Sequence, residues 1–186
     1  THDQSSAASD VYKRQGLVHG IIDTNTKHFC SGKIGLGDRL YHCWKNNGHG
    51  SMNVSDAIKE SCDVFFYEIS KKIGIDKISK VAEDFGLGKI YDIPLPNQKK
   101  GIIPSRDWKK KKYNESWYPG ETLISAIGQG FVLTNPLQLA VMTSIIASNG
   151  KNVKPNIIKQ NSGIEFEKLE KYQNAIEIIK SSMFKA

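Results

Sequence analysis

Residues 48–88 read GHGSMNVSDAIKESCDVFFYEISKKIGIDKISKVAEDFGLG, and the spacing of their apolar side chains decides the fold. Apolar residues recur at every fourth position over residues 65–73, which is typical of one buried face of an α-helix. Gly74 ends this helix, and a second apolar stripe follows over residues 75–85. Because the connection is so short, the two helices are predicted to pack as a hairpin or an angled pair.

The segments on either side give weaker signals. Residues 134–136, Thr-Asn-Pro, place a capping side chain before a proline and predict a helix start, and Asn149-Gly150 predicts its end. Residues 153–158 are predicted to form a short strand after this turn. Because they contain a proline, which has no backbone N–H to donate, the strand is expected at the edge of a sheet. Residues 92–120 hold four of the six prolines and are predicted to be a long ordered loop. Residues 30–50, punctuated by glycines, also read as a loop.

The two ends of the sequence differ from the middle. Residues 1–15 are small and polar without any period, which predicts a disordered end or one that is not native to this protein. The last apolar residues near Phe184 are followed by no cap or glycine. We therefore expect residues 16–186 to form a partial domain that is incomplete at both ends.

Composition excludes several classes of protein. The chain has 186 residues, 39% hydrophobic and 24% charged, which suits one globular domain or part of a larger one rather than a disordered, collagen-like or coiled-coil chain. No uninterrupted apolar run of about 18 residues predicts a membrane span within this sequence.

The net charge of +7 comes almost entirely from lysine. Proteins that bind nucleic acid usually rely on arginine, so no nucleic-acid partner is expected. The densest run, Lys109–Lys112, is interpreted as part of a solvated loop. Its alternative role is electrostatic attraction to anionic phospholipid head groups or to an acidic polymer.

The cysteines cluster in one half of the chain. Cys30, Cys43 and Cys62, together with His49, form the pattern C-x12-C-x5-H-x12-C, whose residue types can close a tetrahedral zinc site. Such a site would cross-link a segment that has little apolar core of its own. The spacing alone leaves two alternatives open, a Cys30–Cys43 disulfide with Cys62 free, or three inert buried thiols.

Two serine patterns in the sequence are candidates for catalysis. Ser61-Cys62-Asp63 lies at the start of the predicted helix, where either Ser61 or Asp63 could simply cap the helix. An S-x-D string is expected about once by chance in a chain of this composition, and Ser105-Arg106-Asp107 is a second one. Of the two S-x-x-K strings, Ser148–Lys151 crosses a predicted helix end and Ser182–Lys185 lies in the tail, so neither is expected to be a nucleophile.

Three stretches together resemble a known family. Residues 48–88, WYPGETLISAIGQGFVLTNPLQLA at 117–140 and ASNGKNVKPNI at 147–157 are similar to the transpeptidase domain of the penicillin-binding protein 2 family, the elongation-specific class B enzymes of peptidoglycan synthesis. The resemblance runs from about Gly16 to Ile158. It implies an α+β fold, of which this chain would be mainly the helical part of a serine β-lactamase/transpeptidase-like domain.

The resemblance also implies catalytic roles. Enzymes of this superfamily carry a nucleophile S-x-x-K, a second motif with a serine, and K-T-G. Ser61-Cys62-Asp63 matches the second motif, in which Ser61 would relay a proton and Asp63 would help to hold the catalytic lysine and the substrate. The nucleophile would fall within residues 5–15, where no S-x-x-K occurs, and K-T-G would lie beyond Ala186.

Zinc and partners follow from the same resemblance. Some members carry a structural zinc whose ligands match Cys30, Cys43, His49 and Cys62, so residues 30–62 are predicted to be a zinc loop. The implied partners are peptidoglycan stem peptides, β-lactam antibiotics and cell-elongation membrane proteins. The implied location is the periplasmic face of the bacterial inner membrane, with an anchor outside this sequence. The alternative is a non-catalytic, zinc-stabilised helical binding module or the product of a decayed gene.

Overall fold

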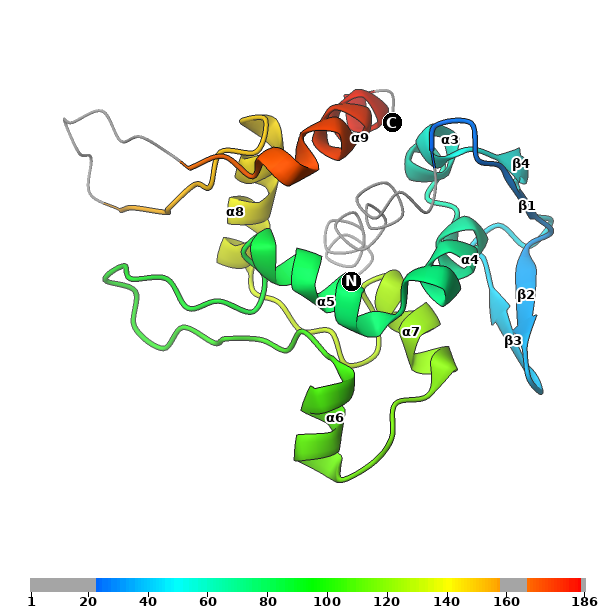
Figure 1. Ribbon diagram of the computed structural model, residues 1–186, viewed down its shortest axis with the longest axis horizontal. Helices are drawn as coiled ribbons and strands as arrows, with labels where there is room; N and C mark the ends of the chain where they lie inside the picture. Colours follow the sequence, from blue (N-terminus) through cyan, green and yellow to red (C-terminus); the bar gives the residue numbers. More distant parts are fainter. Residues whose placement is uncertain (1–22, 158–166, 185–186) are drawn as a thin grey trace.

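Helices α4 (Asp63–Ile73) and α5 (Ile75–Asp84) confirm the two helices expected from residues 48–88, and they meet at Gly74 (Figure 1). Gly74 ends one helix and begins the other with φ of +79°, a left-handed value that glycine adopts without steric cost. The computed structural model describes residues 23–157 and 167–184. The expectation about residues 1–15 therefore concerns a stretch outside the described residues.

The other elements lie before and after this helix pair in the chain. They are β1 (His28–Cys30), β2 (Lys33–Leu36), β3 (Arg39–His42), β4 (Gly50–Met52), α3 (Val54–Lys59), α6 (Arg106–Tyr113), α7 (Pro119–Ala126), α8 (Pro136–Ala147), the 3-10 turn η1 (Glu170–Tyr172) and α9 (Gln173–Phe184). Within the described ranges, no helix has both the length and the hydropathy needed to cross a bilayer.

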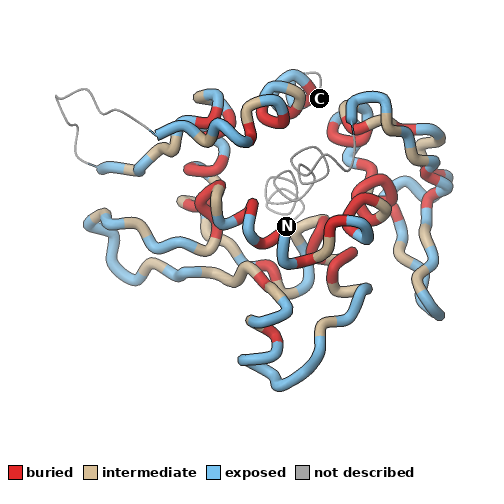
Figure 2. The backbone as a smooth tube through the Cα atoms, in the orientation of Figure 1, coloured by how far each residue is buried: buried red, intermediate tan, exposed pale blue. Residues whose placement is uncertain are grey.

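The core is built around α4, which contacts α3, α5, α7 and three of the strands. Much of this helix is buried and drawn in red in Figure 2. Four consecutive buried residues cover more than one face of the helix, and the full buried set is Val64, Phe65, Phe66, Tyr67, Ile69, Ser70 and Ile73. Full burial of one such large apolar side chain stabilises a fold by about 1.5–3 kcal/mol. The packing of α4 therefore fixes the position of the residues at its start.

The segment 30–50 differs from the loop that was predicted. It contains a hairpin of β2 and β3, turned at Gly37, and its two ends are held by the antiparallel pair β1–β4. In that pair Cys30 lies opposite Gly50. The sequence did not indicate these strands because each has only three or four residues, too few for an alternating apolar pattern to show.

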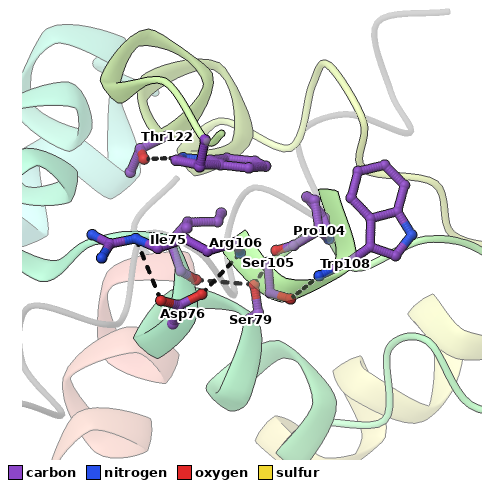
Figure 3. A network of polar contacts seen from close by, with 9 residues as sticks. Ile75, Asp76, Ser79, Pro104, Ser105, Arg106, Trp108 and Thr122 are labelled. Carbon is purple, nitrogen blue, oxygen red and sulfur yellow. Dashed lines mark hydrogen bonds and ion pairs between the residues drawn. The ribbon is translucent and has the colours of Figure 1, made fainter. Parts of the chain in front are cut away.

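The prediction of a long loop over residues 92–120 is wrong in its second half, where α6 and the start of α7 lie. Ser105 caps α6, since its Oγ accepts a hydrogen bond from the Trp108 N–H at 3.1 Å. Asp76 of α5 accepts from the Arg106 N–H at 3.0 Å, and its carboxylate lies 3.5 Å from the Arg106 Nε (Figure 3). Caps and ion pairs, rather than an apolar stripe, define this short helix.

The lysine run belongs to α6, so its interpretation as a solvated loop is also corrected. The Lys109 side chain is only 2% exposed. Its Nζ pairs with Glu121 of α7 at 2.5 Å and lies 4.4 Å from the centroid of the Tyr118 ring. Lys110–Lys112 are exposed in the last turn of the helix.

The C-terminal part contains the predicted helix but not the predicted strand. Helix α8 begins at Pro136, capped by Asn135, which accepts from the Gln138 N–H at 2.9 Å, and a turn at Asn149-Gly150 follows it. Residues 153–157 contain no strand, and Ile158 lies outside the described residues. One isolated bridge at Lys151 is formed with Lys168 instead.

Asp84 joins the C-terminal segment to α5, which makes the stability of this contact dependent on pH. Burial alone would raise the pKa of Asp84, but hydrogen bonds from Lys171, Lys80 and Tyr172 outweigh it and lower the pKa to about 2. Because the folded pKa is below the unfolded value, this stabilisation is present above about pH 4 and is lost as the pH falls towards 2.

We therefore expect acid to remove about 1 kcal/mol of stability through Asp84, a value reduced for solvent screening. Urea denaturation of the chain at pH 5 and at pH 2 measures the loss, and Asp84→Asn serves as the control because asparagine does not titrate. Equal losses for the two proteins would contradict the assignment.

Candidate functional site

Ser61 lies in the turn between α3 and α4, in a conformation that residues with a side chain rarely adopt. Its φ is +50°, and its side chain is exposed. The Ser61 N–H bonds to Ile58 O at 3.3 Å and the Cys62 N–H to Ala57 O at 2.9 Å, the two bonds of a Schellman helix end. Glycine usually occupies this left-handed position, so a serine here is held by its surroundings.

The interpretation of Ser61 or Asp63 as a simple helix cap does not describe the geometry. Cys62, not Ser61, is the N-cap residue of α4, and it makes no side-chain capping bond. The Asp63 carboxylate accepts a hydrogen bond from a distant residue, the backbone N–H of Trp44, at 3.0 Å. The Ser61 turn, which we define as residues 60–63, is thus tied to the segment that follows β3.

The structure brings together Cys30, Cys43, His49 and Cys62, the four residues of the predicted zinc loop. Their four candidate ligand atoms all lie within 4.8 Å of one another. The His49 Nδ1 is 3.6 Å from the sulfur of Cys30 and 3.6 Å from that of Cys43. All three cysteines are free and buried, so the alternative of a Cys30–Cys43 disulfide is not seen. This four-ligand site could hold a metal ion.

Two glycines allow the segments that carry the ligands to approach one another. A Cβ on Gly32 would lie 2.0 Å from Asn46 O, and one on Gly48 would lie 2.1 Å from Cys30 O. Both glycines also have positive φ, at +93° and +75°. Any side chain at Gly32 or Gly48 would collide with these backbone oxygens, so only glycine allows the two backbone segments to pack together. This packing brings the Cys43–His49 loop against the end of β1.

The electrostatics of the site favour an ionised sulfur at Cys43 and a protonated one at Cys62. A hydrogen bond from the Cys62 thiol is the largest cause that lowers the pKa of Cys43, and backbone N–H groups of Lys45, Asp63 and Val64 act in the same direction. The bond to Cys43, together with burial, raises the pKa of Cys62 in return. Thiolates are the form of cysteine that binds metals, so the N–H groups at the start of α4 prepare one ligand.

Trp44 is a residue of this site that the sequence analysis missed. It follows Cys43, and besides its bond to Asp63 its indole Nε1–H donates to Glu60 O at 3.0 Å. Its ring contacts the His49 ring edge to face, with centroids 5.4 Å apart. Only its position next to a candidate ligand could have suggested this role.

The other serines considered have structural surroundings. Ser148 follows the end of α8 and its Oγ bonds to Ile145 O at 3.2 Å, while Lys151 lies beyond the turn, as expected. Ser182 is buried in α9 and bonds to Ser55 Oγ at 2.9 Å; Lys185 lies outside the described residues. Ser105 caps α6, so this second S-x-D string is a helix cap.

A cavity of about 310 Å³ lies at the other end of α4 from Ser61. It is lined by Leu36, Ser70, Lys71, Gly74, Arg106, Trp117, Pro119 and Thr122. Since Ser70 to Gly74 form the last turn of α4 and its cap, the length of the helix separates this cavity from the Ser61 turn.

Comparisons with known proteins place the chain in one family. Residues 15–185 match the family of the penicillin binding protein transpeptidase domain. The chain is 37% identical over 156 residues to the peptidoglycan D,D-transpeptidase MrdA of Salmonella typhimurium, a stretch that is 83% of this chain and 25% of that protein. The chain thus spans about a quarter of the length of the curated relatives it matches.

Solved structures show the same fold. PBP2 of Helicobacter pylori in complex with MreC has a TM-score of 0.87 and 35% identity, covering 95% of this chain and 34% of that chain. PBP2 of Pseudomonas aeruginosa in complex with WCK 5153 has a TM-score of 0.83 and 29% identity, covering 96% of this chain and 42% of that chain. The predicted fold class and the predicted resemblance are both confirmed. This chain belongs to the transpeptidase domain family of the penicillin-binding proteins.

Proposed function

We propose that the chain is part of a peptidoglycan D,D-transpeptidase that cross-links cell-wall stem peptides through a serine acyl-enzyme. The observation that carries the proposal is the Ser61 turn. An exposed serine hydroxyl is held there in a strained backbone conformation, with the Asp63 carboxylate fixed two residues later. Strained backbone of this kind concentrates at functional sites. The chain belongs to the transpeptidase family, and by resemblance Ser61-Cys62-Asp63 corresponds to the second motif of that family.

In this proposal neither Ser61 nor Asp63 is the nucleophile, and both assist a separate nucleophilic serine. The nucleophilic serine of an S-x-x-K motif attacks the penultimate D-alanine carbonyl of one stem peptide, and the terminal D-alanine leaves as its amine is protonated. The Ser61 hydroxyl passes a proton between the catalytic lysine and that amine. Asp63, held by the Trp44 N–H, orients the lysine and the substrate.

Zinc is the ion we propose for the four-ligand site. With Zn–S near 2.3 Å and Zn–N near 2.0 Å, a tetrahedral ion needs sulfur and nitrogen ligands about 3.5 Å apart. The two sulfur–nitrogen distances of 3.6 Å fit this requirement. Three thiolates and one imidazole leave no open position for substrate, so the ion would supply cross-linking and not catalysis. By holding Cys62, it would fix the backbone between Ser61 and Asp63.

We further propose that the protein acts on the periplasmic face of the inner membrane, with β-lactam antibiotics as inhibitors and cell-elongation membrane proteins as partners. The support is the matched family, named for penicillin binding, and the Helicobacter pylori relative, which forms a complex with MreC. Stem peptides are the substrates in this proposal, and no nucleic acid takes part.

Covalent labelling with a fluorescent penicillin tests the proposal. The 186-residue chain should remain unlabelled, because neither S-x-x-K string can act as the nucleophile, whereas a longer form that carries S-x-x-K before residue 16 and K-T-G after residue 186 should label with one penicillin per chain. Labelling of the 186-residue chain would contradict the assignment of the nucleophile. A folded longer form that does not label would overturn the transpeptidase proposal and favour a zinc-stabilised binding module.

A further inference from the structure

Trp44 contacts both the four-ligand site and the Ser61 turn. We propose that Trp44 is a positioning residue that couples the two, so that the arrangement of the ligands sets the arrangement of Ser61 and Asp63. The coupling itself depends only on contacts within this chain. Its consequence for acyl transfer rests on the proposed function.

On the side of the Ser61 turn, Trp44 provides two hydrogen-bond donors. Its indole Nε1–H donates to Glu60 O, one residue before Ser61, and its backbone N–H donates to the Asp63 carboxylate, two residues after Ser61; both distances are 3.0 Å. The left-handed conformation of Ser61 is unfavourable for a residue with a Cβ and must be maintained by contacts from outside the turn. Trp44 supplies such contacts at both ends of the turn.

On the side of the ligands, Trp44 follows Cys43 directly, and its ring packs edge to face on the His49 ring at 5.4 Å with an interplanar angle of 65°. Movement of either ligand would therefore displace the indole and its hydrogen bonds. The Trp44 side chain remains 62% exposed, so apolar burial is not its main contribution. Its contacts are suited to orienting the turn.

Phe29 offers a matched control within the same chain. It is also an exposed aromatic residue beside a cysteine ligand, since it precedes Cys30 and is 72% exposed. Phe29 belongs to β1, where it pairs with Ser51 of β4 and not with the Ser61 turn. Truncation of Phe29 therefore removes an aromatic surface next to a ligand and leaves the indole bond from Trp44 to Glu60 O in place.

Amide hydrogen exchange of the zinc-loaded chain measures the coupling. Trp44→Phe keeps a ring beside His49 but removes the donor to Glu60 O, so exchange of the Ser61 and Cys62 amides should become about fivefold faster, the factor for one lost hydrogen bond. Phe29→Ala should leave these amides unchanged, and zinc content should stay at one per chain in both variants. If Trp44→Phe exchanges at the rate of Phe29→Ala, the coupling is refuted. Trp44→Phe decides the outcome even where Trp44→Ala fails to fold.

A second measurement separates positioning from structural support. In the longer form with all three motifs, Trp44→Phe should slow the acylation step by penicillin about fivefold while the dissociation constant of the non-covalent complex stays within about twofold. Equal effects on both constants would contradict a positioning role. If the unsubstituted longer form is not acylated at all, the proposed function fails, and hydrogen exchange still decides the inference about Trp44.

Discussion

Removal of zinc from the 186-residue chain is expected to lower its melting temperature by about 8–16 °C. A ligand present at a thousand times its dissociation constant stabilises the folded state by about 4 kcal/mol, and one kcal/mol corresponds to about 2–4 °C for a domain of this size. The effect should be large because the four ligands lie on separate segments of residues 30–62 and join the strands to α4. Thermal denaturation with and without a strong chelator, together with metal analysis, gives the measurement.

Two histidines allow a matched comparison for this prediction. His49→Ala removes a ligand, whereas His42→Ala removes an exposed imidazole that lies next to Cys43 and outside the ligand cluster. We expect His49→Ala to lose zinc and most of the chelator-sensitive stability, and His42→Ala to keep both. A chain that contains no zinc and melts identically in chelator would show that the four-ligand site is not a zinc site.

Ser61→Ala is expected to reduce acylation of the longer form by about 10² to 10⁴, the usual contribution of a proton-transfer residue. Its stability should change little, because alanine is as strained as serine at φ of +50°. Ser61→Gly removes the same hydroxyl but relieves that strain, so it should be equally impaired and about 1 kcal/mol more stable. Stopped-flow labelling by a fluorescent penicillin and urea denaturation give the two quantities.

The second S-x-D string supplies the control for Ser61. Ser105→Ala removes the capping oxygen of α6 and should cost about 1 kcal/mol of stability while leaving the rate of acylation unchanged. The two variants are thus expected to differ in opposite ways. Ser61→Ala should lose acylation rate but keep its stability, and Ser105→Ala should lose stability but keep its acylation rate. Normal acylation by Ser61→Ala would remove Ser61 from the proposed mechanism.

The parts of the fold that could be predicted from the sequence are those in which packing and periodicity agree. Helices α4 and α5 each carry an apolar stripe and α8 carries a cap and an end signal, and all three were predicted. Helix α6 was missed because its stability comes from a cap and ion pairs, and its buried residue is a lysine. The four strands were missed because they are short and are held by contacts between segments distant in sequence.

In the candidate site, too, some features could be predicted from the sequence and others could not. The residue types and spacing of Cys30, Cys43, His49 and Cys62 were sufficient to identify a group of possible ligands, and the structure brings them together. The role of Trp44 could not be predicted, because its bonds to Glu60 and Asp63 cross sixteen and nineteen positions of sequence. The left-handed conformation of Ser61 is likewise a result of how two helices are joined, which no local pattern encodes.

That all three cysteines share one site makes the chain sensitive to oxidation as well as to chelation. Their number is odd, so if two sulfurs oxidise to a disulfide, the third is left without a partner and the ligand set is destroyed. In an oxidising compartment the bound ion would protect the thiolates, and its loss would expose them to mispairing. Purification without added zinc or reductant should therefore yield a mixture of disulfide-linked species, and adding the metal afterwards should not restore them.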